Sequence, residues 1–459
     1  MSCKQFLKRT QIKNLKSIFP PEDLLLTPEQ KLIFGTDSSR MLDMPWAVVR
    51  PKSPEQVRDF LYFAQKERIP VFPRARATNM VGACVPRGGG IVLSLLKLNR
   101  ILDLDEQDFV AVVEPGVITY ELQKALAAKG LFYPPDPASV RISTIGGNVS
   151  TNAGGMRALK YGVTRDYVLG LEVVLPGGKL LNLGSRCHKN VVGLDLTRLF
   201  IGSEGTLGVF TRIYLKVLPK PPFTASFLVG FSDLDQALDT VQQIFQAGIL
   251  PTALEIMPDL VLKCIEDIAP VPWPKGTNAV LLIKLDGHEQ GVKQNLVELE
   301  KICAQASVRL KGLGKEEEEL WELRRLINPA SFKLRPTKMS EDITVPRGKI
   351  KEAMERIKQV GQKYGLPILT FGHIGDGNIH TNIMYDVGDD QEAANAQKAK
   401  KEILRIVLGL GGTLSGEHGI GLTKAPFISW QVEPEVLMAM RQIKKVFDPY
   451  NIMNPGKGY

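Results

Sequence analysis

The chain has 459 residues and a mass of 50.7 kDa, of which 44% are hydrophobic and 23% charged. These fractions are ordinary for a folded enzyme and exclude the disordered and fibrous classes. The length predicts two domains of unequal size. Lys and Arg (58) outnumber Asp and Glu (49), which gives a net charge of +9. Because this excess is spread along the chain, it favours anionic ligands or an acidic partner surface over a nucleic-acid footprint.

The number and spacing of the cysteines limit which metal clusters and disulfides the chain can form. No two of its five cysteines form a CxxC pair, which argues against an iron–sulfur cluster or a Cys-ligated zinc site. Their low density also argues against a disulfide framework and suits a reducing compartment. The five are Cys3, Cys84, Cys187, Cys264 and Cys303.

The N-terminus is basic but lacks the continuous apolar core of a signal peptide. No apolar run approaches the roughly 20 residues that a membrane span needs. We therefore expect a soluble, cytoplasmic protein, with any attachment to the inner membrane made through a partner.

In chain order, residues 1–40 are expected to form a helical lead-in. A strand is predicted at 47–50. Ser53 then caps a helix that runs to about Lys66, with Pro54 at its first position and Gln56 as the reciprocal capping partner. Further strands are predicted at 69–72, 91–94 and 110–114, and a further helix at 120–129.

The first half of the chain is rich in glycine loops. No GxGxxG follows any of these strands and no GxxxxGK[ST] occurs, which disfavours a Rossmann site and a P-loop. A turn alone explains one glycine-rich loop. Four in one half, interleaved with Asn, Ser and Thr, favour an extended cofactor cleft, because small residues let backbone amides approach an anion or a flat ring.

The second half begins after a stiff Pro219–Pro222 break. A strand is predicted at 227–231, a helix capped by Ser232 and running to about Ala247, and a strand at 253–256. The pattern recurs with a strand at 279–285 and a helix at 291–306, which indicates an α+β domain. The charge run 315–319 is interpreted as a solvated helix face.

Three of the five histidines lie in two glycine-rich C-terminal segments, 371–380 and 414–421. A seven-residue offset would put His373 and His380 on opposite faces of one straight strand. The Asp376-Gly377 turn signal can break that period, so that the two imidazoles converge. Two imidazoles and a carboxylate suit zinc or another divalent metal. The alternative for each histidine taken singly is a satisfied structural residue. His188 and His288 are interpreted as surface or structural residues.

Several motifs appear in one order and together resemble the FAD domain of the GlcD-type D-2-hydroxyacid dehydrogenases, flavoproteins of the vanillyl-alcohol-oxidase fold group. The resemblance runs from about residue 41 to the C-terminus. It implies an α+β fold with a two-subdomain FAD-binding domain at 41–220, an α+β substrate or cap domain with the metal site at 221–415, and a segment at 416–459 that completes the active site. The motifs lie at 132–137, 144–148, 153–155, 160–164 and 202–208.

The resemblance implies non-covalent FAD as the cofactor, since no histidine lies near the phosphate loop. In the family that loop reads Pro-Arg-Gly-x-Gly-Thr, whereas Ala75 and Ala77 replace both glycines here and Arg76 lies between them. Alanine resists positive φ, so the loop must avoid that conformation or carry strain. Either Arg74 or Arg76 is expected to contact phosphate. The implied FAD residues are Arg74, Ala75, Arg76, Ala77, Thr78, Asn79, Gly82, Pro135, Asp136, Ser139, Gly146, Gly147, Asn148, Thr151, Asn152, Gly155, Gly162, Glu204, Gly208, Val209 and Asn454.

The two C-terminal histidine motifs match the family without a gap. They imply a divalent metal, zinc first and manganese or iron as alternatives, held by His373, His380 and Glu417, with His418 as the catalytic base. The Trp-x-x-Arg stretch implies Arg324 as the residue that grips the substrate carboxylate, with Arg325 as its solvated neighbour. Lys338 is carried over as a second positive contact.

These roles imply FAD-dependent oxidation of a small D-2-hydroxy acid, D-lactate or glycolate first and D-2-hydroxyglutarate as the alternative. Hydride passes to flavin N5, and a carbanion route is the alternative. An iron–sulfur subunit, an electron-transfer flavoprotein or quinone is implied as electron acceptor. Two other functions stay open: a redox-neutral transferase like alkyl-dihydroxyacetonephosphate synthase, and a non-catalytic flavin scaffold.

Overall fold

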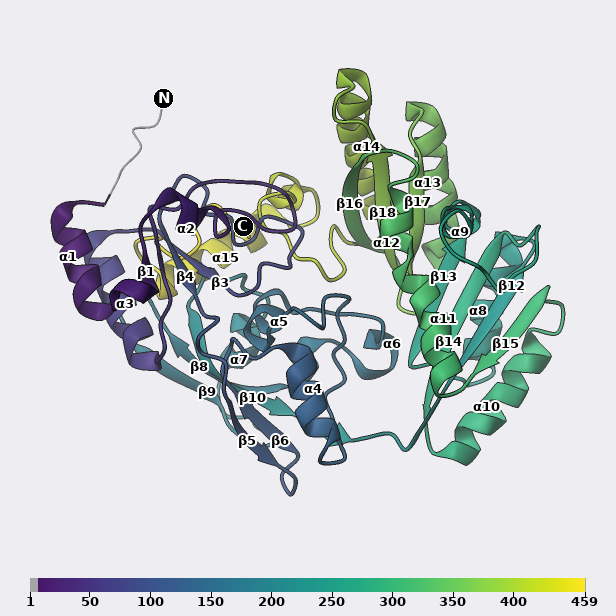
Figure 1. Cartoon of the computed structure of the whole chain (residues 1–459), viewed down its shortest axis with the longest axis horizontal. Helices are drawn as coiled ribbons and strands as arrows, with labels where there is room; N and C mark the ends of the chain where they lie inside the picture. The colour runs from purple at the N-terminus through teal and green to yellow at the C-terminus, as the bar shows by residue number, and fades with distance from the viewer. Residues whose placement is uncertain (1–6, 459) are drawn as a thin grey trace. The chain divides into compact units, whose positions relative to one another are not determined.

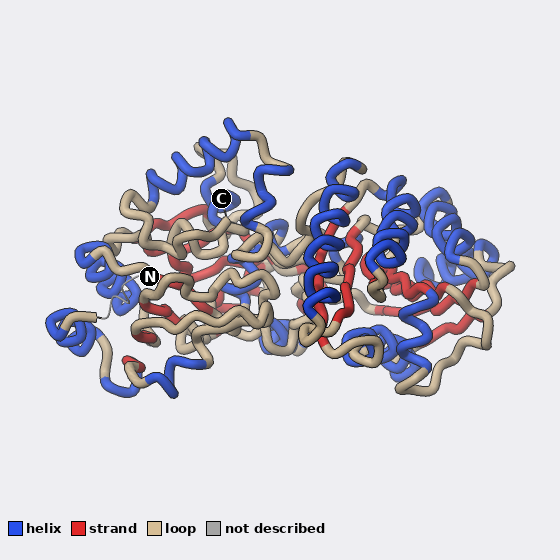
Figure 2. The backbone as a smooth tube through the Cα atoms, turned by 90° about the horizontal axis from the view of Figure 1, so that it is seen from above, coloured by secondary structure: helices blue, strands red, loops and turns tan. Residues whose placement is uncertain are grey.

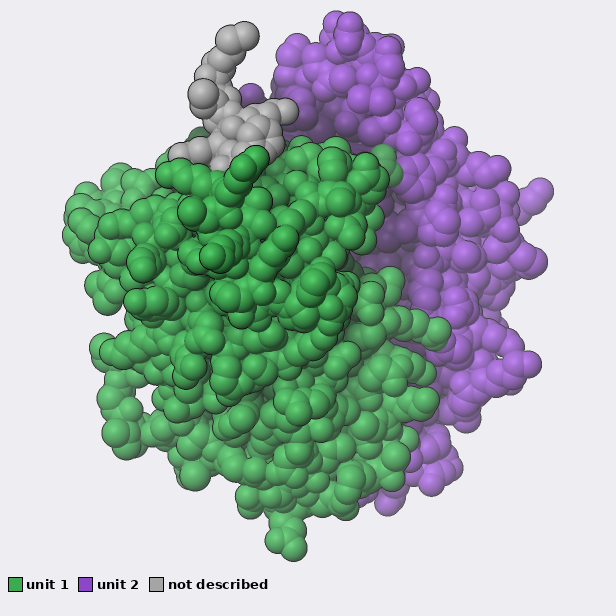
Figure 3. Space-filling view, turned by 60° about the vertical axis from the view of Figure 1, so that its left-hand side comes forward, with its two compact units in different colours: residues 1–154, 163–220, 417–459 green, residues 155–162, 221–416 purple. Residues whose placement is uncertain are grey.

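The computed structural model describes residues 7–458, so Cys3 lies outside the described residues. The chain forms two compact units (Figure 3). Unit 1 comprises residues up to 154, 163–220 and 417–459, and unit 2 comprises 155–162 and 221–416. The chain therefore crosses between the units within three of the predicted motifs, at 154/155, 162/163 and 416/417.

Unit 1 is built on two sheets with helices packed around them (Figure 1). The four-stranded sheet has the order β1-β2-β4-β3, with β2, β4 and β3 parallel, and the antiparallel five-stranded sheet has the order β5-β6-β10-β8-β9. The strands are β1 Leu24–Leu25, β2 Ala47–Val49, β3 Val71–Arg74, β4 Ile91–Ser94, β5 Ile101–Asp105, β6 Val110–Val113, β8 Val168–Val174, β9 Leu180–Gly184 and β10 Val209–Lys216, with the small pair β7 Leu131–Phe132 and β11 Leu218–Pro219. The helices are α1 Arg9–Ile18, α2 Pro28–Leu32, α3 Pro54–Glu67, α4 Thr119–Ala127, α5 Ile145–Thr151, α7 Leu196–Phe200 and α15 Pro434–Phe447, with the 3-10 turns η1 Pro21–Asp23, η2 Thr164–Asp166 and η4 Ala425–Trp430.

Helix α3 begins as the sequence predicts, with one difference in its cap. Ser53 Oγ accepts from the N–H of Gln56 at 3.4 Å. The Gln56 Oε1 accepts from the N–H of Lys52 at 2.7 Å, one residue before the expected partner. The apolar side of α3, including Val57, Phe60 and other residues, is buried in a core that also contains β2, β3 and β4.

The C-terminal segment is part of the same core. The N–H of Val71 donates to the carbonyl of Ile452 at 2.7 Å, and the N–H of Asn454 donates to the carbonyl of Val71 at 2.8 Å. Ile452 and Met453 are buried. The end of the chain thus runs beside β3, which leads into the predicted phosphate loop.

Unit 2 is one antiparallel seven-stranded sheet with helices against it (Figure 2). Its order is β15-β12-β14-β13-β17-β18-β16. The strands are β12 Phe223–Phe231, β13 Ala253–Pro258, β14 Ala279–Gly287, β15 Val308–Gly312, β16 Thr337–Thr344, β17 Ile368–His373 and β18 Asn378–Tyr385. The helices are α6 Ala158–Tyr161, α8 Leu234–Gln246, α9 Asp259–Glu266, α10 Glu289–Ile302, α11 Lys315–Arg325, α12 Ile327–Ser331, α13 Ile350–Tyr364 and α14 Asp390–Gly409, with the 3-10 turn η3 Arg347–Lys349.

Two predictions for unit 2 are wrong in detail. Asp233, not Ser232, caps α8, because its carboxylate accepts from the N–H of Asp235 at 3.2 Å. The charge run at the start of α11 is not uniformly solvated, since Glu317 is buried. Its carboxylate accepts from Thr224 Oγ1 at 2.7 Å and pairs with Lys284 at 2.6 Å.

In the part of the chain from residue 7 to 458, no helix combines the length and the apolar character needed to cross a membrane.

Candidate active site

Unit 1 contains a cleft formed by segments that lie far apart in the sequence. Its wall includes the loop after β3, the start of α5, the 204–210 segment, and Glu417 with His418. Thr144 caps α5 by accepting from the N–H of Gly147 at 3.2 Å. Gly146 packs so closely on Pro115 that a Cβ would lie 2.4 Å from the proline Cβ. Glycine is required there for α5 to approach the preceding loop.

Most of the residues expected to bind FAD line this cleft: Arg74, Ala75, Arg76, Ala77, Thr78, Asn79, Ser139, Gly146, Gly147, Asn148, Thr151, Glu204, Gly208 and Val209. Others expected there do not form its wall: Gly82, Pro135, Asp136, Asn152 and Asn454 in unit 1, and Gly155 and Gly162 in unit 2. Wall residues that the sequence did not single out include Met80, Cys84, Leu95, Ser150 and Phe210. These have small or apolar side chains, which carry little functional signal in one sequence.

The two alanines of the phosphate loop realise both of the outcomes that the sequence left open. Ala77 has φ +56°, in the left-handed region that favours glycine. Ala75 is not among the positive-φ residues. One of the two glycine-to-alanine departures is therefore accommodated without strain, and the other is not.

The two arginines of this loop have different partners. The Arg74 guanidinium donates to the carbonyls of Thr36 at 2.6 Å and Ile33 at 2.9 Å, so it is occupied in holding the 33–36 segment. Arg76 is exposed, and within residues 7–458 it forms no hydrogen bond or ion pair. Arg76 is therefore the better placed of the two to meet an anion.

The backbone of the loop fits an anionic group such as the FAD pyrophosphate. Within the described part of the chain, the N–H groups of residues 76–80 donate no hydrogen bond to the protein. A run of such amides with a positive φ in its middle is typical of anion-binding concavities. Gly147 faces the loop, where an added Cβ would lie 3.5 Å from that of Ala75 and narrow the cleft.

A buried carboxylate fixes the backbone that follows His418. Glu204 Oε1 accepts from the N–H of Ile420 at 2.6 Å, and Oε2 accepts from the N–H of Gly421 at 2.8 Å. Glu204 itself has φ +51°. Burial raises the pKa of Glu204, while the two amides act in the opposite direction. Asn454 Nδ2 donates to the carbonyl of Glu204 at 2.6 Å, so Asn454 supports the site without lining the cleft.

Unit 2 brings together the two histidines expected to bind metal. Strand β17 ends at His373 and β18 begins at Asn378, with a turn at Gly377 (φ +86°). Phe371 pairs directly with His380, so the side chain of His373, two residues on, lies on the same face. The two ring centroids are 5.1 Å apart, and the rings meet edge to face. The predicted turn and the convergence of the imidazoles are confirmed.

A third residue, Glu255 on β13, binds both His373 and Arg324. Its Oε1 contacts His373 Nδ1, and its Oε2 accepts from Arg324 Nε at 2.6 Å. Glu255 is completely buried. Burial raises the pKa of Glu255, but the charges and hydrogen bonds of His373 and Arg324 outweigh it and lower that pKa to about 2. Arg324 Cζ also lies over the Phe371 ring, 4.8 Å from its centroid, in a cation–π contact that helps to hold the guanidinium in place.

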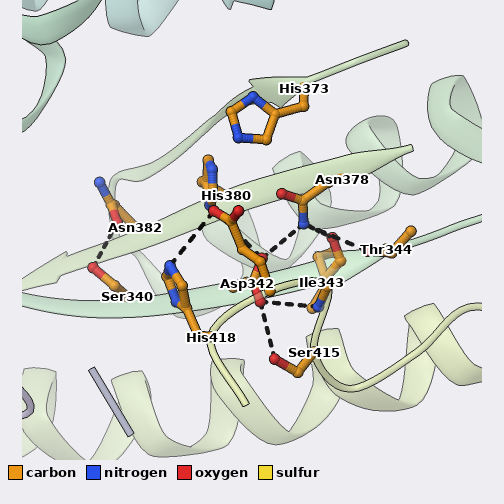
Figure 4. Close-up of polar contacts among 12 residues, drawn as sticks. Ser340, Asp342, Ile343, Thr344, His373, Asn378, His380, Asn382, Ser415 and His418 are labelled. Atoms are coloured by element: carbon orange, nitrogen blue, oxygen red, sulfur yellow. Dashed lines mark hydrogen bonds and ion pairs between the residues drawn. The ribbon is translucent and has the colours of Figure 1, made fainter. Parts of the chain in front are cut away.

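Asp342 on β16 ties the second histidine motif to the sheet (Figure 4). It is fully buried and lies opposite His380, with 3.9 Å between Asp342 Oδ1 and His380 Nδ1. Its carboxylate accepts from Asn378 Nδ2 at 2.7 Å, Ser415 Oγ at 3.0 Å and the N–H of Gly416 at 2.9 Å. The residue before Glu417 is therefore anchored beside β18.

The remaining predicted residues of unit 2, Lys338 and Arg325, contact residues other than Glu255 and the two histidines. Lys338 Nζ donates to Asn328 Oδ1 at 2.9 Å and lies over the Phe332 ring. Arg325 pairs with Glu318 and Glu322 on the solvent side of α11, as expected of the neighbour of Arg324.

His188 and His288 are exposed, and the other histidines expected in the site are not. His188 Nε2 contacts the carbonyl of Asp108 at 2.9 Å, and His288 precedes the first residue of α10.

Sequence reasoning missed Glu255 and Asp342 as members of the site. For Glu255 the available signal was a single carboxylate in a strand that is otherwise apolar. Asp342 gave no such signal, because β16 also contains Lys338 and Glu341. A buried carboxylate is rare unless it is paired.

The two units and the cleft define a class of protein. The architecture is that of flavoproteins of the p-cresol methylhydroxylase and vanillyl-alcohol-oxidase group. The solved structure of p-cresol methylhydroxylase with substrate bound matches with a TM-score of 0.82 at 18% identity, over 99% of this chain and 97% of that one. Alkyldihydroxyacetonephosphate synthase matches with a TM-score of 0.78 at 20% identity, over 100% of this chain and 86% of that one. At these identities the likeness shows the fold alone.

The chain belongs to the FAD-linked oxidases. Residues 220–458 match the family described as FAD linked oxidases, C-terminal domain, and residues 45–184 match the FAD binding domain. It is 41% identical to the glycolate oxidase subunit GlcD of Bacillus subtilis, over 97% of this chain and 96% of that protein. It is 34% identical to the D-lactate dehydrogenase of Anaerostipes hadrus (100% and 99% covered) and to the D-2-hydroxyglutarate dehydrogenase of Stutzerimonas stutzeri (97% and 98%). The chain is thus an FAD-dependent oxidoreductase.

Proposed function

We propose that this chain oxidises a small D-2-hydroxy acid to the 2-oxo acid, with FAD in the unit 1 cleft and a divalent metal beside the β17–β18 hairpin. The observation that carries the proposal is in unit 2. The ring centroids of His373 and His380 lie 5.1 Å apart, and the carboxylate of Glu255 contacts both His373 and Arg324. A metal site and a carboxylate-binding cation on one sheet face suit a substrate that has a hydroxyl next to a carboxylate.

The residues proposed to hold the metal are His373, His380 and Glu417. Chain continuity supports the inclusion of Glu417, because the preceding Gly416 is anchored on Asp342, which lies opposite His380. Two imidazoles and one carboxylate suit zinc first and manganese or iron as alternatives. When bound, such a cation lowers the pKa of a ligated hydroxyl.

His418 is the proposed base, and its imidazole lines the same cleft as the phosphate loop. An imidazole exchanges protons near neutral pH, so His418 is suited to take a proton from the substrate. Glu204 holds residues 420 and 421 and so limits the motion of the segment that carries this imidazole. When bound, FAD supplies the two-electron acceptor for the oxidation at C2.

Arg324 is proposed to bind the substrate carboxylate. Its Nε donates to Glu255. A substrate carboxylate can therefore accept two hydrogen bonds from the two terminal nitrogens, Nη1 and Nη2, of the same guanidinium. Lys338, on strand β16 beside β18, is a second cation and is proposed as an auxiliary contact.

The substrate is proposed to be D-lactate or glycolate, with D-2-hydroxyglutarate as the alternative, from the names of relatives that are 34–41% identical. We propose that the electrons leave through a partner subunit, an electron-transfer flavoprotein or quinone. The first of these is supported by one relative being named a subunit of glycolate oxidase. The redox-neutral transferase has only a likeness of fold in its favour.

The test is anaerobic reduction of the bound flavin, followed by its visible absorbance, on the purified full chain loaded with FAD and zinc. D-lactate, L-lactate, glycolate and D-2-hydroxyglutarate are added separately. We expect rapid bleaching by at least one of the three substrates other than L-lactate, and its loss in His418→Ala and after chelation. His288→Ala, an exposed histidine outside both motifs, is the matched control. Bound flavin that none of the acids reduces would contradict the proposal and favour a scaffold or transferase role.

A further inference from the structure

Glu255 is a charged residue within β13, a strand whose other side chains are apolar. Its neighbours on the same face of β13 are Ala253 and Met257, both buried, and its cross-strand neighbour on β14 is Leu282. Replacing buried ion pairs by well-packed apolar groups is often neutral or stabilising. A carboxylate at this point of the sheet therefore calls for a reason other than stability.

The contacts of Glu255 supply that reason. On the other side of β13, Glu255 is directly paired with His373 of β17. One carboxylate oxygen contacts His373 Nδ1 and the other accepts from Arg324 Nε. An ionised carboxylate only accepts hydrogen bonds, so the proton of a neutral His373 is fixed on Nδ1. The lone pair of that imidazole is then on Nε2, which makes Nε2 the ring nitrogen that can act as a metal ligand.

The same carboxylate fixes the orientation of the arginine. The hydrogen bond from Nε to Glu255 and the contact of Cζ with the Phe371 ring restrict the rotation of the Arg324 side chain. Its side chain is 12% exposed, so it retains an accessible edge. Glu255 thus connects the two groups that a 2-hydroxy acid would meet, one toward its hydroxyl and one toward its carboxylate.

We propose that Glu255 is a positioning residue that sets the tautomer of His373 for metal binding and, through its second oxygen, the orientation of Arg324 for the substrate carboxylate. This inference rests on the proposed function, because it takes His373 to be a metal ligand. Carboxylates that orient metal-bound histidines contribute 10- to 100-fold to metal affinity in other proteins.

The first experiment compares zinc affinity, by competition with a chromogenic chelator, in the full FAD-loaded chain and in Glu255→Gln. We expect binding roughly 10- to 100-fold weaker in the variant. Glu317→Gln is the matched control, since it also removes the charge of a buried, partnered glutamate of unit 2, and its affinity is expected to stay at the wild-type value. Equal zinc affinity in Glu255→Gln and the wild type would overturn the inference.

Glu255→Asp keeps the charge but shortens the side chain, and an affinity between those of the wild type and Glu255→Gln is expected. An aspartate variant as weak as Glu255→Gln shows that length matters as much as charge, which also supports positioning. The inference is wrong if Glu255→Asp and a folded Glu255→Gln both bind zinc with the wild-type affinity.

The second experiment observes the wild-type chain itself and uses variants only to assign its histidine signals. The chain has five histidines, so 15N-labelled histidine gives a spectrum simple enough to assign by single His→Gln changes. In the metal-free wild type we expect the Nδ1–H tautomer for His373. The Nε2–H tautomer would overturn the inference. If the wild-type chain takes up no zinc, the proposed metal site fails, and the tautomer of His373 alone decides for or against Glu255.

Discussion

Replacing Ala77 by glycine is expected to stabilise the protein. At φ +56° the Ala77 Cβ lies close to the following carbonyl, which costs an L-residue about 1–2 kcal/mol. Glycine removes this cost but adds freedom to the unfolded chain, worth about 0.4–1 kcal/mol in the opposite direction. The difference is a net gain of about 0.5–1 kcal/mol in the free energy of unfolding. In a unit of this size that corresponds to about 1–4 °C in the midpoint of thermal unfolding.

The assay is thermal and urea unfolding of the FAD-free chain, with Ala75→Gly as the matched control. Ala75 lies in the same loop and also replaces a family glycine, but it is not among the positive-φ residues. Its glycine variant is expected to lose about 0.4–1 kcal/mol. The opposite signs of the two variants are the diagnostic result. If both glycine variants lose stability equally, Ala77 does not occupy the left-handed region and the reasoning is refuted.

Two further predictions concern buried carboxylates of unit 1. Glu204→Gln keeps only one good acceptor for the two amides at 420–421, so we expect a loss of about 1–3 kcal/mol in unfolding free energy and faster amide exchange at both positions; unchanged exchange would contradict this. Burial raises the pKa of Asp23, but hydrogen bonds from Lys52 and Lys97 outweigh it and lower that pKa below 3.8. Asp23 therefore stabilises the fold above pH 3.8, and this contribution is lost as the pH falls from there through the folded pKa. Asp23→Asn is expected to be less stable at neutral pH and to converge with the wild type in urea unfolding at acid pH; a constant difference across pH would count against the assignment.

The sequence by itself was sufficient for the elements whose signals are local. The Ser53–Pro54 start of α3 follows from capping chemistry that involves only neighbouring residues. The Asp376-Gly377 turn signal likewise predicts the reversal of the chain between β17 and β18, because a tight turn between two extended segments brings them side by side as antiparallel strands. The sequence also indicated that alanine in the phosphate loop must avoid positive φ or carry strain, and the structure shows which alanine does which.

What only the tertiary structure decided depends on pairings between distant segments. Nothing near Glu255 in the chain indicates His373, which is 118 residues away, and the partners of Glu204 lie more than 200 residues further on. The same holds for Arg74, which the local motif offers for phosphate as an alternative to Arg76, but whose guanidinium donates to the carbonyls of Ile33 and Thr36 in the fold. Local preferences act over a few residues, whereas the partner of a buried charge is chosen by which strands become neighbours in the sheet. The packing of the whole unit determines which strands are neighbours, and therefore which residues pair with Glu255, Glu204 and Arg74.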